Sequence, residues 1–251
     1  LFGDKVTNHF PDDIRGKRKL ARLIAEALIA KPVFSDSEQP LFHGDPHAGN
    51  LFLTEEGRLG ILDWSLSGRL GVSERTAIVQ IILAAITLDS RRMAGILTQL
   101  ADRQKLNSTA LQTVTEKWVK RVRRGQFPGM GWLMGMLDEA VQIARLRVST
   151  DLVLFRKSIL TLEGVIADVG QCDGQIDNTL TIEFLRNFAK ELPQRWIQSP
   201  DSREFSTRLS NFDLTQLILS YPTTVTSFFT GNVFDILEAF ANSQQETSAS
   251  K

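Results

Sequence analysis

Apolar side chains recur at the spacing of one helix face between residues 14 and 34, and Lys and Arg occupy many of the positions between them. Spacings of three and four residues place such side chains on one side of an α-helix. The pattern therefore predicts an amphipathic helix that ends at Pro32. Its apolar face comprises Leu20, Leu23, Ile24, Ala27, Leu28 and Ala30.

Shorter apolar segments follow the polar loop at 35–40. "LFHG" and "NLFLT" are rich in Leu and Phe, and they flank "DPHAG", in which Pro46 and Gly49 favour a tight loop. "EEG" at 55–57 predicts a turn, and "RLGILDW" predicts a second strand in which Asp63 continues the alternation of Leu and Ile on one face. The expected result is a β-hairpin with polar groups at its mouth.

The pattern becomes helical again from Ser73, which is expected to be the N-cap of the first helix. Beyond residue 200 we expect two or three shorter helices around Tyr221-Pro222, within an extension at 201–241, and a disordered tail at 242–251. The main domain is expected to span 1–200. Its predicted helices are 74–89, 90–103, 108–124, 130–147, 151–170 and 179–197.

Composition narrows the class of protein. The chain has 251 residues, and its 29 basic side chains balance 29 acidic ones, so no net field favours nucleic acid as a partner. The single Cys172 excludes an internal disulfide and fits a reducing compartment, such as the cytoplasm or an organelle interior. The longest apolar run, at 77–88, is shorter than the roughly 18 residues that a transmembrane helix needs.

Acid, amide and imidazole groups are concentrated between residues 43 and 63. Phosphoryl transfer needs a carboxylate near the attacking hydroxyl and oxygen ligands that hold magnesium against the phosphates. Asp45, Asn50 and Asp63 supply these groups, because a tight loop lets the first two point into one cleft and the third follows the next strand. His43 is placed to brace the loop by hydrogen bonds to the backbone.

"HGDPHAGN" followed by "LDWS" resembles the catalytic loop and metal-binding motif of kinase-like folds, H-x-D-x-x-x-x-N and D-F-G. Gly68-Arg69-Leu70, Arg75 and "LFRKSILTLEGV" at 154–165 make the chain similar to the UbiB family of atypical kinase-like proteins. The likeness covers about 14–195. The chain departs from the family pattern at Gly44, Ala48 and Trp64-Ser65.

The resemblance implies a mainly α-helical, kinase-like C-lobe in which a small β-hairpin carries the catalytic loop. It implies a phosphotransferase or ATPase that uses magnesium and ATP and is linked to ubiquinone, other prenyl-quinone or lipid metabolism. Asp45 and His43 are the implied catalytic residues, and Asn50 and Asp63 are the implied ligands of magnesium and its nucleotide.

An N-lobe with five strands and a helix requires on the order of 60 residues. Only 42 residues precede His43, and the helix at 14–34 takes half of them. We therefore expect a C-lobe separated from its N-lobe, which by itself binds ATP poorly.

Four alternatives for the 43–63 cluster remain open. The "HGD" and "DW" motifs also occur in aminoglycoside and choline phosphotransferases. The fold could instead be a non-catalytic, pseudokinase-like scaffold that binds a lipid or regulates a partner. His43, Asp45 and His47 alternate and could bind zinc or manganese. Finally, Asp and Asn could simply cap backbone groups in a hairpin.

Two further segments each have an ordinary and a sharper interpretation. A basic run is either a solvated helix face or a contact with anionic lipid at a membrane surface. The apolar segment at 128–136 is either core or a groove that faces lipid or a partner. Glu163 and Arg156 could form a structural ion pair within the domain and are assigned no catalytic role. The basic run consists of Lys117, Lys120, Arg121, Arg123 and Arg124.

Overall fold

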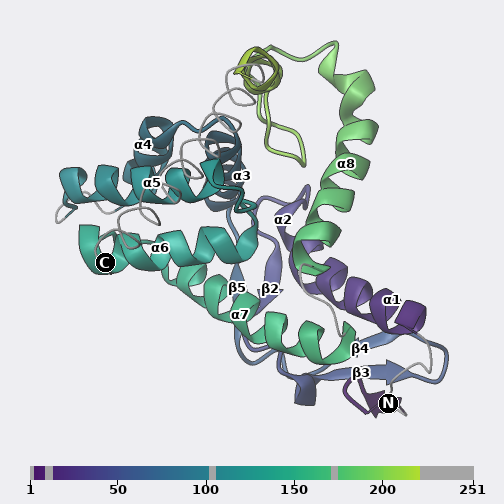
Figure 1. Cartoon of the computed structure of the whole chain (residues 1–251). Helices are drawn as coiled ribbons and strands as arrows, with labels where there is room; N and C mark the ends of the chain where they lie inside the picture. The colour runs from purple at the N-terminus through teal and green to yellow at the C-terminus, as the bar shows by residue number, and fades with distance from the viewer. Residues whose placement is uncertain (1–2, 9–13, 102–105, 171–174, 221–251) are drawn as a thin grey trace, which may run out of the picture.

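The computed structural model describes residues 3–8, 14–101, 106–170 and 175–220. In these residues the protein is mainly α-helical, with two small antiparallel sheets beside the helices (Figure 1). The strands are β1 (Gly3–Lys5), β2 (Leu41–His43), β3 (Leu51–Thr54), β4 (Leu59–Ile61) and β5 (Ser67–Arg69). The longer helices are α1 (Ile14–Ala25), α3 (Val72–Ile86), α4 (Ser90–Leu100), α5 (Ser108–Arg123), α6 (Met130–Ala144), α7 (Thr150–Gly170) and α8 (Gln175–Arg195).

The predicted helices beyond residue 73 are all present, with ends that differ by a few residues. The first of them starts earlier than predicted, because Gly71 rather than Ser73 is the N-cap of α3. Gly71 has the extended backbone that an N-cap needs, whereas Ser73 lies inside the first turn and donates its hydroxyl to Glu74.

The first predicted helix is present and ends at Val33, one residue after Pro32. After α1 the chain forms one π-helical turn (Glu26–Ala30) and then α2 (Lys31–Val33), which contains the proline. Pro32 has no N–H and would clash with the preceding turn of a regular helix. Within α2 it occupies the first turn, where no intrahelical N–H is needed, so the helix continues to Val33.

The predicted hairpin is confirmed, since β3 and β4 pair antiparallel and Leu51 lies opposite Ile61. β1 adds a third strand next to β3, and β5 pairs with β2, neither of which the sequence predicted. The expectation that Asp63 continues the strand was wrong. β4 ends at Ile61, and Asp63 has a left-handed φ of 53°.

Helix α7 runs along the sheets and the first helix. Its buried side chains face α1, β2 and β5, and Phe42 meets Phe155 edge to face with ring centroids 5.1 Å apart. Gly68 in β5 is required by this packing, because a Cβ there would lie 2.4 Å from the ring of Phe42. The strand that carries His43 is therefore held from two sides.

The predicted ion pair between Arg156 and Glu163 is absent. Arg156 pairs with Asp138 of α6 instead, because the two helices pack side by side. Glu163 is half-buried, and this burial, together with the nearby Asp177, raises its pKa. The segment at 128–136 is mostly buried core at the start of α6, as its ordinary interpretation predicted.

The segment after α8 folds back onto the helices. Residues 203–210 are not helical and residues 211–220 are, so one short helix is confirmed, whereas Tyr221-Pro222, the rest of 221–241, the tail and Cys172 lie outside the described residues. Asp213 is buried and accepts hydrogen bonds from Arg92, Arg203 and Gln80. None of the helices in the described part of the chain is long and apolar enough to span a bilayer.

Replacing Asp213 tests whether its hydrogen bonds anchor the segment after α8 to the helices. Burial by itself raises the pKa of Asp213, but the hydrogen bonds from Arg203, Ser210 and Gln80 outweigh it and hold the pKa well below its usual range. Asp213→Asn should lower the free energy of unfolding by about 3 kcal/mol at pH 7, because it leaves the Arg network without its carboxylate.

The pH dependence of unfolding, measured with urea, gives a second check. A carboxyl with a depressed folded-state pKa stabilises the protein above its unfolded-state pKa of about 4, and this stability is lost as the pH falls below that value. The difference between wild type and Asp213→Asn should therefore shrink below about pH 4. The exposed Asp201→Asn is the matched control, and an equal loss in both variants would contradict the anchor.

Candidate functional site

The catalytic loop predicted from the sequence begins where β2 ends. His43 is the last residue of β2, and the chain then turns through Gly44 to a short 3-10 helix, Ala48–Asn50, that leads into β3. The Nδ1 atom of His47 accepts a hydrogen bond from the N–H of Gly49 and caps this turn. Gly49 is needed here, because a Cβ would lie 2.9 Å from the His47 ring.

The imidazole of His43 joins the two halves of the site. It is buried, its Nδ1 atom accepts the backbone N–H of Asp45 at 3.1 Å, and its Nε2 atom lies 2.9 Å from the carbonyl oxygen of Leu62. Because Nδ1 accepts a hydrogen bond, Nε2 carries the ring proton and donates a hydrogen bond to the carbonyl oxygen of Leu62. One neutral ring thus connects the residue before Asp63 to Asp45.

Asn50 closes the same network. Its Nδ2 atom donates to the backbone oxygen of Asp45 at 3.2 Å, and its own backbone oxygen accepts the N–H of Leu62 at 2.9 Å. The side chain is mostly buried. Since the amide nitrogen is used in this bond, the amide oxygen remains as the group that can ligate a cation.

Asp63 differs from the other three site residues because it is exposed. Its Oδ1 atom accepts hydrogen bonds from the hydroxyl of Ser65 at 2.5 Å and from the backbone N–H of Ser65 at 3.3 Å. These two bonds lower the pKa of Asp63. Trp64 packs edge-on against His43, with ring centroids 5.0 Å apart. The Trp64-Ser65 pair that departs from the family pattern therefore positions both the imidazole and the carboxylate.

Helix α7 holds the loop from behind. The hydroxyl of Ser158 donates to the carbonyl oxygen of His43 at 2.7 Å in the buried interior. Leu154 and Leu66 fill the space next to Gly44, where a Cβ would lie 2.9–3.0 Å from them. The Nζ atom of Lys157 lies 3.5 Å from Oδ1 of Asp45. Lys157 could not be found from the sequence, because nothing in its spacing relates it to residue 45.

A buried guanidinium holds the segment that precedes β2. Arg75 is fully buried, and it donates to the carbonyl oxygens of Ser35, Ser37 and Glu38, the last at 3.1 Å. Burial and the neighbouring Arg208 lower its pKa to about 10, so it stays charged at neutral pH. Arg208 also donates to Ser35, at 3.2 Å. The entry to β2 is therefore fixed by α3 and by the segment after α8.

The oxygen groups fit magnesium better than zinc. No group of three or more His, Cys, Asp or Glu side chains in the described residues could hold a metal by itself. Magnesium is usually held by one or two carboxylates together with the phosphates of its nucleotide, and Asp63, with the amide oxygen of Asn50, could supply such ligands. The zinc or manganese alternative is wrong for His43, because both of its ring nitrogens are bound to backbone groups.

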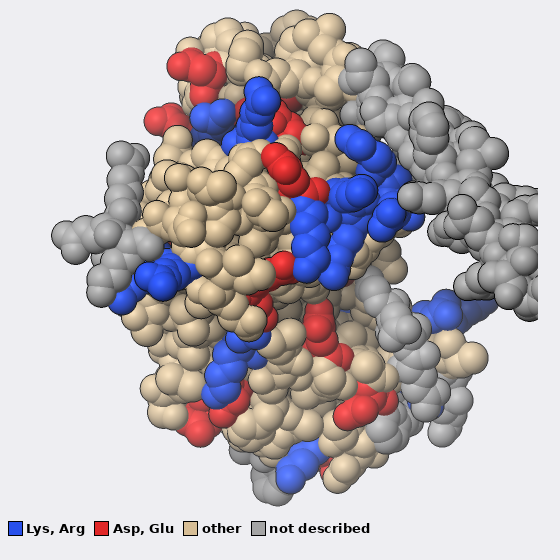
Figure 2. Space-filling view, turned by 60° about the vertical axis from the view of Figure 1, so that its left-hand side comes forward, with Lys and Arg blue, Asp and Glu red and all other residues tan. Residues whose placement is uncertain are grey.

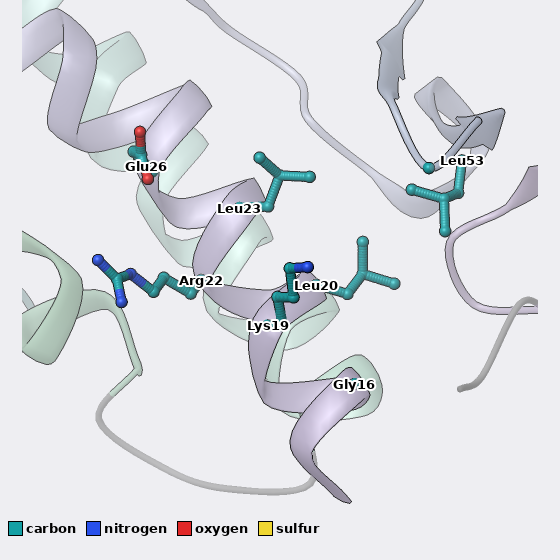
Figure 3. A pocket seen from close by; sticks show the side chains of 8 residues that line it. Gly16, Lys19, Leu20, Arg22, Leu23, Glu26 and Leu53 are labelled. Atoms are coloured by element: carbon teal, nitrogen blue, oxygen red, sulfur yellow. The ribbon is translucent and has the colours of Figure 1, made fainter. Parts of the chain in front are cut away.

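A separate cavity of about 420 Å³ lies between α1 and the β3–β4 hairpin. Leu20 and Leu23 point from α1 toward Leu53 of β3, whereas Arg22 points away from that strand (Figure 3). None of the four predicted site residues lines this cavity. It is a mostly apolar hollow beside the site and not the site itself.

Residues 5–97 match the family model of the ABC1 atypical kinase-like domain. This part of the chain is therefore similar to ABC1 atypical kinase-like domains. The matched residues include the four predicted site residues, and the UbiB-type resemblance drawn from the sequence motifs is confirmed.

Proteins of bacteria and plants are similar to parts of the chain. An uncharacterized protein of Synechocystis is 28% identical over 156 residues, which is 61% of this chain and 37% of the relative. The chloroplastic protein ACTIVITY OF BC1 COMPLEX KINASE 1 of Arabidopsis thaliana is 26% identical over 128 residues, 50% of this chain and 19% of the relative. An uncharacterized chloroplastic aarF domain-containing protein kinase of the same plant is 44% identical over 61 residues, 24% of this chain and 11% of the relative.

These matches cover only part of this chain and only part of each relative. The chain spans 37% of the length of the Synechocystis relative and 19% of the length of ACTIVITY OF BC1 COMPLEX KINASE 1. No solved structure matches the chain.

Replacing His43 tests the network. His43→Phe keeps a ring against Trp64 but removes both nitrogens, so the N–H of Asp45 and the oxygen of Leu62 lose their partner. We expect the free energy of unfolding, measured with urea, to fall by about 2 kcal/mol. His47→Phe removes a single cap bond on an exposed ring and should cost less than about 1 kcal/mol. Equal costs would show that the imidazole of His43 contributes nothing beyond ring packing.

Proposed function

We propose that the chain is the catalytic, C-lobe part of an ABC1-family atypical kinase or ATPase that acts on magnesium-bound ATP. The observation that carries the proposal is the hydrogen-bonded network through His43, which connects the Asp45 loop to the segment that bears Asp63. A loop that only turned the chain would not need a buried imidazole bridging it to a second loop.

Each site residue has a role in this proposal. Asp45 orients or deprotonates the attacking water or acceptor hydroxyl, and His43 holds the backbone of Asp45 in place. The amide oxygen of Asn50 and the carboxylate of Asp63 hold magnesium, which when bound neutralises the charge on the phosphates. The lowered pKa of Asp63 keeps its carboxylate ionised for this purpose.

Two parts of the proposal rest on the family resemblance alone. The first is that nucleotide binding also requires residues of an N-lobe. The second is a link to prenyl-quinone or lipid metabolism. The family match favours the ABC1 assignment over an aminoglycoside or choline phosphotransferase.

The magnesium site is tested with Asp63→Asn in the intact protein. Loss of one charged ligand should reduce magnesium-dependent ATP hydrolysis by roughly 100-fold. Glu56→Gln, an exposed carboxylate in the hairpin turn, is the control and should keep wild-type activity. The catalytic proposal is wrong if Asp63→Asn hydrolyses ATP as fast as this control.

A non-catalytic, lipid-binding scaffold is the second candidate, and the surface of α5 favours it. Figure 2 shows Lys and Arg side chains gathered on the side of the molecule where α4, α5 and α6 come forward. Lys120 and Arg121 on α5 and its C-cap residue Arg124 are exposed, and the exposed Phe127 follows in the next loop. Lys117 is paired with Glu139 at 2.7 Å, so its charge is partly compensated. Basic and aromatic side chains together suit an anionic lipid surface.

Charge reversal separates this candidate from the catalytic one. Lys120→Glu with Arg124→Glu should release the protein from vesicles that contain anionic lipid, because each basic group near such a surface contributes about 1 kcal/mol. Sedimentation with anionic and with neutral vesicles measures the effect. Retention that is equal on both kinds of vesicle, or unchanged in the variant, would argue against a lipid contact through α5.

A further inference from the structure

The strongest unassigned feature is the cation beside Asp45. Lys157 lies on α7, its Nζ atom is 3.5 Å from Oδ1 of Asp45, and its side chain is 52% exposed. Asp45 itself is 39% exposed. Both groups can therefore be reached by a ligand in the site.

The position of Lys157 is determined by its neighbours in α7. Ser158, the next residue, is bonded to the carbonyl oxygen of His43, and Leu154, one turn earlier, packs on Gly44. Arg156 is turned to the other side, where it pairs with Asp138. These contacts fix the register of α7 against the loop, so that Lys157 is the residue of this turn that faces Asp45.

The loop has no cation of its own. Between residues 40 and 68 the only Lys or Arg is Arg58, which is 79% exposed and paired with Glu56 in the hairpin turn. Phosphoryl transfer places developing negative charge on the oxygens of the transferred group, and a positioned cation stabilises it. Exposed ion pairs contribute little to stability, so the Lys157–Asp45 pair has no large structural role to account for it.

We propose that Lys157 is a catalytic residue that binds the terminal phosphoryl group of ATP. This inference rests on the proposed function. The oxygen of water or of an acceptor hydroxyl forms a bond to the terminal phosphorus, and the bond between that phosphorus and the bridging oxygen breaks. ADP leaves with the electron pair, and Asp45 takes the proton of the attacking group. Lys157 turns from Asp45 to the phosphoryl oxygens and stabilises their charge.

The test compares Lys157→Met and Lys157→Arg in the intact protein. Affinities for ATP and for ADP, each with magnesium, are measured by displacement of a fluorescent nucleotide. Lys157→Met should weaken ATP binding roughly tenfold and leave ADP binding unchanged, because only ATP has the γ-phosphate that Lys157 would contact. It should also lower kcat for ATP hydrolysis by roughly 100-fold. Lys157→Arg should retain part of the affinity for ATP and part of the kcat that Lys157→Met loses.

Lys190→Met, which replaces an exposed lysine on α8, is the matched control and should behave as wild type. The melting temperature of Lys157→Met should fall by no more than about 4 °C. Equal weakening of ATP and ADP, or wild-type values for both, overturns the assignment of Lys157. If Asp63→Asn still loses magnesium-dependent binding in that case, the proposed function stands; if Asp63→Asn binds as wild type, the proposed function falls as well.

Discussion

The buried imidazole of His43 is the interaction on which the arrangement of the site depends. It accepts from the backbone of Asp45 and donates to the backbone of Leu62, so two loops that are 17 residues apart share one rigid connector. A lysine or a carboxylate could not replace it, because the position requires one acceptor and one donor on opposite sides of a flat ring. Being neutral, the ring also carries no charge whose burial would be costly.

The rest of the fold keeps this connector in place from several directions. Ser158 holds the carbonyl of His43 from α7, and Trp64 covers the ring from the side of Asp63. Arg75 gathers the carbonyls of residues 35–38 just before β2. These supports come from elements that are distant in sequence, so the geometry of the loop is a property of the whole helical assembly.

The segment after α8 belongs to this assembly although it lies outside the residues that match the ABC1 family model. Arg208 joins Arg75 at the carbonyl of Ser35, and Asp213 ties the same segment to α3 and α4 through Gln80 and Arg92. Buried charges of this kind are costly unless each has partners, and here Asp213 and Arg75 have several. A change near residue 210 can therefore alter the entry to β2 without touching the loop between β2 and β3.

Much of this structure was predictable from the sequence, because helical periodicity and turn residues act locally. The six helices beyond residue 73, the β3–β4 hairpin and the family motif at 43–63 could all be deduced in this way. Even so, nothing local indicates the π-helical turn at Glu26–Ala30 that precedes Pro32.

Tertiary structure decided which distant groups meet. Asp63 leaves the strand with a left-handed φ, Arg156 pairs with Asp138 rather than Glu163, and Lys157 reaches Asp45 across more than a hundred residues. Local patterns carry no record of such contacts, because the register between two packed helices or between a helix and a loop depends on how many side chains fit together at once. The sequence thus determined the elements and the motif, whereas packing decided what surrounds the motif.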